Sequence, residues 1–169
     1  MLVEAKNHIV SALTAAGVPE KRVFDGAAAL TDTKLVPRAV IHFRMADERI
    51  KADGMQVSWW LTDDLPRKRV YRRRLWRREL DVMIAVVGDS DAAVSDYISG
   101  FFSAVGYGFK DAQDNWVGIQ AGQSEWHEDK AKTSKRTECI LQITLSGGVY
   151  QDTEYALATE LDETGEVEQ

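Results

Sequence analysis

One long segment, residues 67–87, combines a block of positive charge with a strand pattern, and it constrains the fold more than any other part of the sequence. From residue 79 onward, aliphatic side chains occupy every second position: Leu80, Val82, Ile84 and Val86. A period of two is typical of a strand with one buried face. The preceding residues, Arg67 to Arg78, are named here the basic block; eight of these twelve are Arg or Lys, and none is acidic. The segment therefore predicts a core strand that continues as a cationic extension.

Aromatic residues accompany the basic block. Residues 55–61 (MQVSWWL) have the composition of a strand, and residues 62–66 (TDDLP) have that of a turn. Followed by a strand over 70–87, they predict a long hairpin whose tip and distal arms carry Trp59, Trp60, Tyr71 and Trp76. Because neighbouring side chains of a strand point to opposite faces, at most one of Trp59 and Trp60 can easily enter the same core.

Periodicity elsewhere predicts two helices and several strands. One helix is expected over residues 1–16, ended by Gly17, and another over 91–105, with Ser90 as its N-cap. Strands are expected over 37–45, 115–126 and 136–146, with a short extended piece at 22–25. A polar turn region is expected at 47–54, a charged hairpin loop at 125–135, and an end to the last strand at Gly147 and Gly148.

This order of elements predicts an α+β fold with a mainly antiparallel sheet. The N-terminal helix and one central helix would pack on the sheet, and a long β-hairpin would extend from it. We assign residues 1–150 to a single domain and residues 151–169 to an acidic C-terminal tail. The final part of this tail has little apolar surface to bury, so we expect it to be mobile.

Charge is strongly segregated along the chain. The formal net charge is −6, and because the basic block contributes +8, the remaining residues sum to −14. The last eighteen residues, 152–169, hold seven acids and no base. A positive patch on a negative body can associate head to tail with copies of itself, or it can be presented to nucleic acid.

The patterns that usually indicate an enzyme are absent from the sequence. It has no Gly-rich phosphate loop, nucleophile elbow or Cys cluster, and its single Cys139 lies among apolar residues, as a core residue does. We therefore expect no catalytic activity, cofactor or bound metal. The N-terminus does not read as a signal peptide and no segment is apolar enough for a membrane span, so we expect a soluble protein made in the cytoplasm.

Two acidic clusters could in principle bind a metal ion. The run EWHED at 125–129 could bind a divalent ion but lacks a second ligand group at a defined spacing, so a solvated loop is favoured. Glu79 and Asp81 follow a turn that carries Asp63 and Asp64, as acids do in metal-dependent nucleases. The Lys that should follow the second acid is replaced by Val82, which argues against that interpretation.

The basic block has three possible interpretations. It could be a solvated hairpin, although eight cations repel one another without counter-charge. It could bind nucleic acid, with Tyr71 and Trp76 stacking on bases. It could form a protein interface, which we favour because Arg, Trp and Tyr are common anchors and complementary acids lie in 152–168 and 125–129. The predicted interface residues are Arg67, Lys68, Arg69, Tyr71, Arg72, Arg73, Arg74, Trp76, Arg77, Arg78, Trp59 and Trp60.

Five segments carry a resemblance to a known family. They are MLVEAKNHIVSALTAAGV, PRAVIHFRM, the hairpin ending RRELDVMIAVVG, SDAAVSDYISGFFSAVG and the strand pair ending RTECILQITLSGGVY. In this order they resemble the tail terminator (tail completion) proteins of long-tailed bacteriophages and prophages. The same layout also fits other phage head–tail connector and neck proteins. The resemblance spans about residues 1–150 and implies a non-catalytic virion protein.

Such proteins form rings, commonly hexamers of six subunits, that cap the finished tail tube and support head–tail joining. The resemblance implies three protein partners: other copies of this chain, the tail tube protein and the head–tail connector protein. DNA would pass through the lumen without specific binding, and no membrane would be involved. The expected location is the tail or neck of the virion, after assembly in the host cytoplasm. The basic block is longer than this layout requires, so its partner could be a neighbouring subunit, the tube, the connector or DNA.

Overall fold

The computed structural model of the chain describes residues 2–26, 35–128 and 136–157. Its helices are α1 (Leu2–Ala15) and α2 (Asp91–Val105), with short 3-10 turns η1 (Glu20–Arg22) and η3 (Met45–Asp47). Its strands are β1 (Val23–Asp25), β2 (Arg38–Phe43), β3 (Arg49–Leu61), β4 (Lys68–Gly88), β5 (Gly108–Lys110), β6 (Trp116–Glu128) and β7 (Thr137–Ala156).

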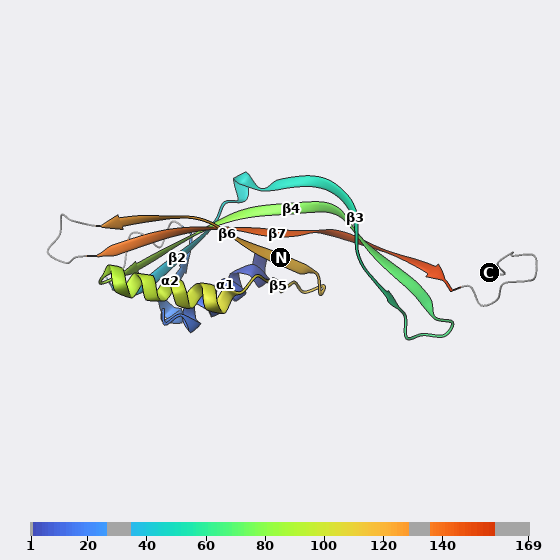
Figure 1. Ribbon diagram of the computed structural model, residues 1–169, viewed down its shortest axis with the longest axis horizontal. Helices are drawn as coiled ribbons and strands as arrows, with labels where there is room; N and C mark the ends of the chain where they lie inside the picture. Colours follow the sequence, from blue (N-terminus) through green and yellow to red (C-terminus); the bar gives the residue numbers. More distant parts are fainter. Residues whose placement is uncertain (1, 27–34, 129–135, 158–169) are drawn as a thin grey trace, which may run out of the picture. The chain divides into compact units, whose positions relative to one another are not determined.

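The strands form one sheet in the order β1-β2-β4-β7-β6-β5, and β3 pairs with β4 outside that path. Strand β1 pairs with β2 in parallel, whereas β2 with β4, β5 with β6 and β6 with β7 pair antiparallel. Figure 1 shows α1 and α2 lying on the same face of the sheet. The predicted α+β fold, with a mainly antiparallel sheet, two helices packed on it and a long hairpin, is confirmed.

The chain divides into two compact units. Unit 1 comprises Met1–Arg49 and Arg78–Gly147, and unit 2 comprises Ile50–Arg77 and Gly148–Gln169. Strands β3, β4 and β7 contribute residues to both units. The assignment of residues 1–150 to one domain and 151–169 to a tail stays a prediction.

The core of unit 1 lies between the sheet and the two helices. The alternating residues of β4 predicted to be buried, Leu80, Val82, Ile84 and Val86, are each 0% exposed. Buried residues of the helices complete the same cluster: Ala5, Ile9 and Leu13 from α1, and Val94, Phe101 and Val105 from α2. Cys139 is also buried in this cluster, and burial raises the pKa of its thiol. Its interpretation as a small core residue is therefore confirmed.

Helix α2 begins and ends where the sequence predicts. The Ser90 hydroxyl accepts a hydrogen bond of 3.2 Å from the backbone N–H of Ala93, and Gly106 ends the helix with a positive φ of 63°. Gly100 lies where α2 approaches α1 closely, because a Cβ there would come within 3.0 Å of the Ala16 Cα. This glycine therefore allows the two helices to pack, although it lowers the intrinsic stability of α2.

Three element boundaries differ from the prediction. Strand β3 begins at Arg49 and includes part of the region 47–54 that was expected to be a turn; every residue of β3 is exposed, so no buried face produces an alternating pattern. Strand β7 continues to Ala156, past Gly147 and Gly148. A Cβ at Gly148 would lie 2.5 Å from the Arg74 Cδ, so the glycine makes room for that side chain and does not end the strand.

The third difference lies at the end of β6. Residues 125–128 belong to β6 and not to the expected hairpin loop, of which residues 129–135 lie outside the described residues. Residues 158–169, where a mobile tail was expected, lie outside them as well. The short β5 had not been predicted, since three residues are too few to show a period.

Candidate functional site

Unit 2 carries the predicted interface residues from Trp59 to Arg77. Its described residues, 50–77 and 148–157, form strands and a connecting loop and contain no helix. The loop between β3 and β4 is closed by two hydrogen bonds of 2.9 Å, from the Thr62 N–H to the Lys68 carbonyl and from the Lys68 N–H to the Thr62 hydroxyl. The predicted turn is therefore confirmed, and β4 lies between β3 and β7.

One face of unit 2, named here the paired face, neutralises much of the basic block. Three cations of β4 at even-numbered positions pair with carboxylates of the same unit: Lys68 with Glu154, Arg72 with Asp152, and Arg74 with Asp53. Val70 lies between the first two and is 4% exposed. Successive side chains of a strand alternate between faces, so these residues share one face of β4. The basic block contains no acidic residue to balance its cations. Carboxylates from other parts of the same chain supply that negative charge.

On the paired face, Arg72 contacts both a carboxylate and an aromatic ring. Its Nε and Nη2 each donate a hydrogen bond of 2.7 Å to the Asp152 carboxylate, and its guanidinium lies 4.9 Å from the centre of the Trp60 ring. This pair lowers the pKa of Asp152 below its usual value. The hydrogen bond with Glu154 likewise raises the pKa of Lys68. Both effects favour the charged forms, as expected for charge-assisted hydrogen bonds.

The opposite face of unit 2, named here the aromatic face, exposes rings beside arginines. Arg69 lies 5.3 Å from the centre of the Trp59 ring and donates a hydrogen bond of 3.3 Å to the Tyr71 hydroxyl. Tyr71 meets Tyr155 of β7 edge to face, with ring centres 5.5 Å apart. By alternation, the aromatic face comprises Val57, Trp59, Leu61, Arg69, Tyr71, Arg73 and Tyr155.

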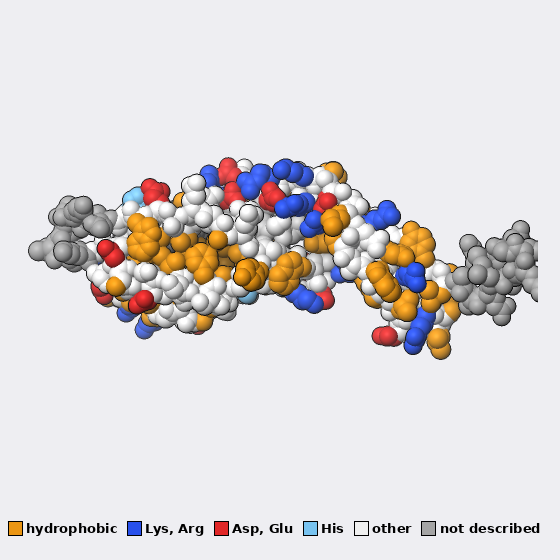
Figure 2. All heavy atoms as spheres, in the orientation of Figure 1, with side chains coloured by type: hydrophobic (Ala, Val, Ile, Leu, Met, Phe, Trp, Pro, Cys, Tyr) orange, Lys and Arg blue, Asp and Glu red, His pale blue; other side chains and the backbone are white. Residues whose placement is uncertain are grey.

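Large apolar side chains of the aromatic face remain accessible. Trp59 is 57% exposed and Tyr155 is 51% exposed. Figure 2 shows hydrophobic and basic side chains interleaved over unit 2. A hollow of about 520 Å³ opens on this surface and is lined by Arg69, Tyr71, Tyr155, Ala156 and Leu157. Aromatic rings beside a hollow are well suited to contact another macromolecule.

Other predicted interface residues have different surroundings. Arg67 and Arg73 are exposed and form no ion pair with any residue that the structure describes. Trp76 is 46% exposed, and Arg77 is exposed as well. Arg78 belongs to unit 1, where its Nε donates a hydrogen bond of 2.8 Å to Glu48 and its Nη2 lies 2.6 Å from the same carboxylate oxygen in an ion pair. The predicted set is thus divided between two faces of unit 2 and the edge of unit 1.

The acids considered for a nuclease site are engaged by an arginine. Arg49 donates two hydrogen bonds, of 2.9 and 3.1 Å, to Asp81 and one of 3.4 Å to Glu79. Thr144 donates a further bond of 2.7 Å to Asp81, which is 7% exposed. These donors lower the pKa of Asp81. No group of three possible metal ligands occurs among the described residues, so the Asp81 carboxylate is explained by its ion pair.

Sequence reasoning missed the carboxylates of the paired face. It treated residues 152–168 as a surface for another molecule, yet Asp152 and Glu154 meet Arg72 and Lys68 of the same chain. Their spacing of two was an available signal, because it places both acids on one face of a strand. This signal was missed because the last strand was expected to end at Gly147 and Gly148, before these two acids.

No protein-family profile matches the chain, and no curated protein matches it. Among solved structures, it is similar to a chain from the virion of a native gene transfer agent particle, with 10% identity and a TM-score of 0.38 over 83% of this chain and 84% of that chain. A likeness at this level does not assign a function. Among the described residues, no helix is both long and apolar enough to cross a membrane.

Proposed function

We propose that this chain is a structural protein of a phage-like particle. It assembles into a ring, with six subunits as the expected number, that caps the tail tube and supports head–tail joining. The observation that carries this proposal is the exposed aromatic face of unit 2, with Trp59 and Tyr155 more than half exposed. The tail-terminator resemblance of the sequence supports the same function.

The described residues of unit 2 form a single layer of strands. A sheet normally buries at least one face against another element. Unit 2 has no helix of its own among the described residues, and large apolar side chains are left in water. Exposed apolar patches of this kind mark interaction sites in soluble proteins, and Trp, Tyr and Arg are the residues that most often dominate binding energy. A second copy of the chain would bury them.

Charge supports a head-to-tail arrangement. The described residues of unit 2, 50–77 and 148–157, hold eight bases and five acids, whereas residues 79–109 of unit 1 hold five acids and no base. Opposite charge on two different patches favours contact between unit 2 of one copy and unit 1 of the next. A heterologous contact of this type closes into a ring when its rotation permits.

The experiment is a comparison of assembly between surface variants. Trp59→Ser combined with Tyr155→Ser removes the two most exposed rings of the aromatic face, and we expect the protein to elute as a folded monomer. Tyr107→Ser is the control, because Tyr107 is 91% exposed in unit 1 and lies outside this face. Light scattering after gel filtration gives the mass of each variant, and circular dichroism reports its folding. Normal assembly of the double variant would exclude the aromatic face as the interface.

A second candidate function is nucleic-acid binding through the same face. Arg69 contacts Trp59 and Tyr71, and Arg73 shares their face by alternation along β4, so phosphates and bases could contact cations and rings together. The paired face argues against it, since Lys68, Arg72 and Arg74 are already engaged by carboxylates. A fluorescence titration with single-stranded and duplex DNA at low and high salt tests this function. Binding that falls steeply with salt would support it, and no binding at low salt would eliminate it.

A further inference from the structure

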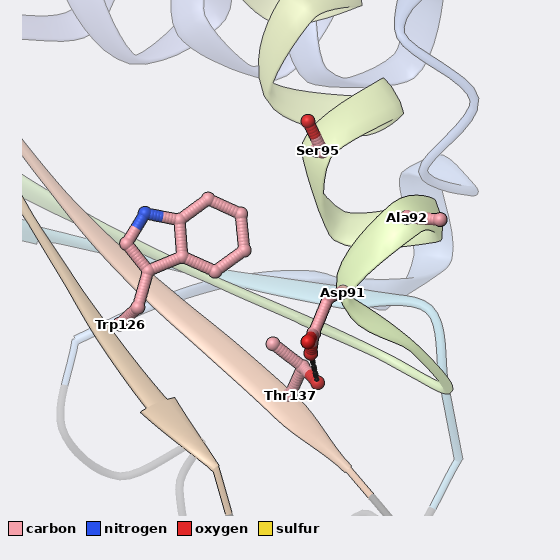
Figure 3. A pocket seen from close by; sticks show the side chains of 5 residues that line it. All are labelled: Asp91, Ala92, Ser95, Trp126 and Thr137. Carbon is pink, nitrogen blue, oxygen red and sulfur yellow. Dashed lines mark hydrogen bonds between the residues drawn. The ribbon is translucent and has the colours of Figure 1, made fainter.

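A second pocket lies in unit 1, and none of the predicted interface residues lines it. It opens between the first turns of α2 and the strands β6 and β7, and is lined by Asp91, Ala92, Ser95, Trp126 and Thr137 (Figure 3). Its volume is about 520 Å³, and Trp126 is 45% exposed. Figure 2 shows further hydrophobic side chains gathered on the surface between α2 and these strands. The pocket therefore combines an accessible indole ring with a carboxylate.

The carboxylate of this pocket is held in place. The Thr137 hydroxyl donates a hydrogen bond to Oδ1 of Asp91, and Thr137 is 5% exposed. The second oxygen of Asp91, Oδ2, forms no hydrogen bond with any other described residue. Figure 3 shows the Trp126 ring on the opposite side of the pocket, with Ser95 also on the α2 side. The Asp91 carboxylate can therefore accept a hydrogen bond from a planar group that stacks on the Trp126 ring.

The electrostatics of the pocket favour a cation. Asp89, Asp91 and Asp96 are exposed near the start of α2, and they outnumber Arg136, the one described Lys or Arg that is next in sequence to a lining residue. The positive end of the helix dipole amounts to only about half a charge, so three carboxylates outweigh it. The local field therefore attracts a positive side chain and repels an anion.

Guanidinium is the cation that best fits these groups. It stacks on aromatic rings and donates hydrogen bonds to carboxylates at the same time. The chain already contains this combination in unit 2, where Arg72 lies over Trp60 and donates to Asp152. Within the described residues, no arginine lies over Trp126. The pocket thus has two of the three groups of that arrangement.

We infer that the pocket receives Arg73 from a second copy of this chain. Arg73 lies on the aromatic face, is exposed, and forms no ion pair with a described residue. This inference rests on the proposed ring, and it specifies the complementary half of the contact: the aromatic face of one subunit meets the Asp91–Trp126 pocket of the next. The contact is heterologous, because different residues take part on the two sides.

A charge exchange tests this pairing. Arg73→Glu and Asp91→Arg should each weaken self-association by about tenfold or more, because each places like charges in contact. The variant with both substitutions should recover association to near the wild-type level. Sedimentation velocity over a concentration series measures the association, and thermal melting confirms folding. Lys51→Glu and Glu20→Arg are the matched controls, since they make the same charge changes at exposed positions outside the pairing.

Two further variants separate binding from folding. Asp91→Asn keeps an oxygen for the Thr137 hydroxyl and removes only the charge, and Trp126→Leu keeps apolar volume and removes the π surface. Both should weaken association with little change in melting temperature. If the wild type assembles but the double exchange does not restore the single variants, the pocket inference is wrong and the ring proposal stands. If the wild type stays monomeric throughout the series, both are wrong.

Discussion

Arg72 donates two hydrogen bonds of 2.7 Å to Asp152, a residue 80 positions later in the chain. These two hydrogen bonds join the most basic segment of the sequence to the beginning of its acidic C-terminal segment. It explains how neighbouring arginines can be tolerated in one strand, because carboxylates of the same unit lie among them. It also separates the cations that stabilise unit 2 from those, such as Arg73, that remain available to a partner.

The Arg72–Asp152 pair should hold the end of β7 in the sheet. Asp152→Asn removes the charge, and we expect a loss of about 0.5–1 kcal/mol, because both side chains are partly solvated and the pair is bidentate. Amide hydrogen exchange at residues 150–155 should therefore become about two- to fivefold faster. Asp63→Asn in the hairpin loop is the control. Equal exchange in both variants would mean that the pair contributes nothing to this end of β7.

Asp81 should make the stability of the protein sensitive to acid. Its pKa is lowered in the folded state by Arg49 and Thr144, so the ionised carboxylate stabilises unit 1. This contribution is complete above the unfolded value near 3.8 and is lost as the pH falls below it through the lower folded pKa.

Asp81→Asn should cost about 1–3 kcal/mol at neutral pH, because Arg49 loses the nearer of its two charged partners and keeps the more distant Glu79. Urea unfolding at several pH values between about 2 and 7 should show a shallower acid loss for this variant than for the wild type. Asp89→Asn, at an exposed position, should leave the slope unchanged. Parallel profiles for Asp81→Asn and the wild type would contradict the assigned role.

Gly100 should be essential for the packing of α1 against α2. Gly100→Leu introduces atoms where even a Cβ would come within 3.0 Å of Ala16, so we expect destabilisation of about 1–3 kcal/mol. Ser99→Leu changes the neighbouring exposed position of the same helix and should alter stability by only about 0.5 kcal/mol. Thermal melting of the two variants provides the comparison. Similar melting temperatures for the two variants would show that α1 and α2 can move apart without loss of stability.

The parts of the fold that the sequence predicted are those with a buried face. The alternation of Leu80 to Val86 indicated the core half of β4, and the apolar spacing of α2 with its Ser90 cap indicated both helix ends. In each case, burial forces a regular pattern on the sequence. Strand β3 lacks such a face, because its residues are all exposed, and its first part therefore resembled a turn.

The candidate site was predicted only in outline. The basic block and its aromatic residues were located, but their division between the paired and aromatic faces depends on which strands lie beside β4. The order of strands is set by long-range pairing, which local pattern does not contain. The pocket of Asp91 and Trp126 was missed for the same reason, since α2 and β6 meet only in the folded chain.

The mass of the purified wild-type protein, measured by light scattering over a range of concentration and salt, tests the central claim most directly. We expect a discrete assembly of ring size, visible as annular particles in negative stain, that loosens at high salt as the charged contact weakens. A monomer at every concentration and salt would contradict the claim that unit 2 is an interface between copies of this chain.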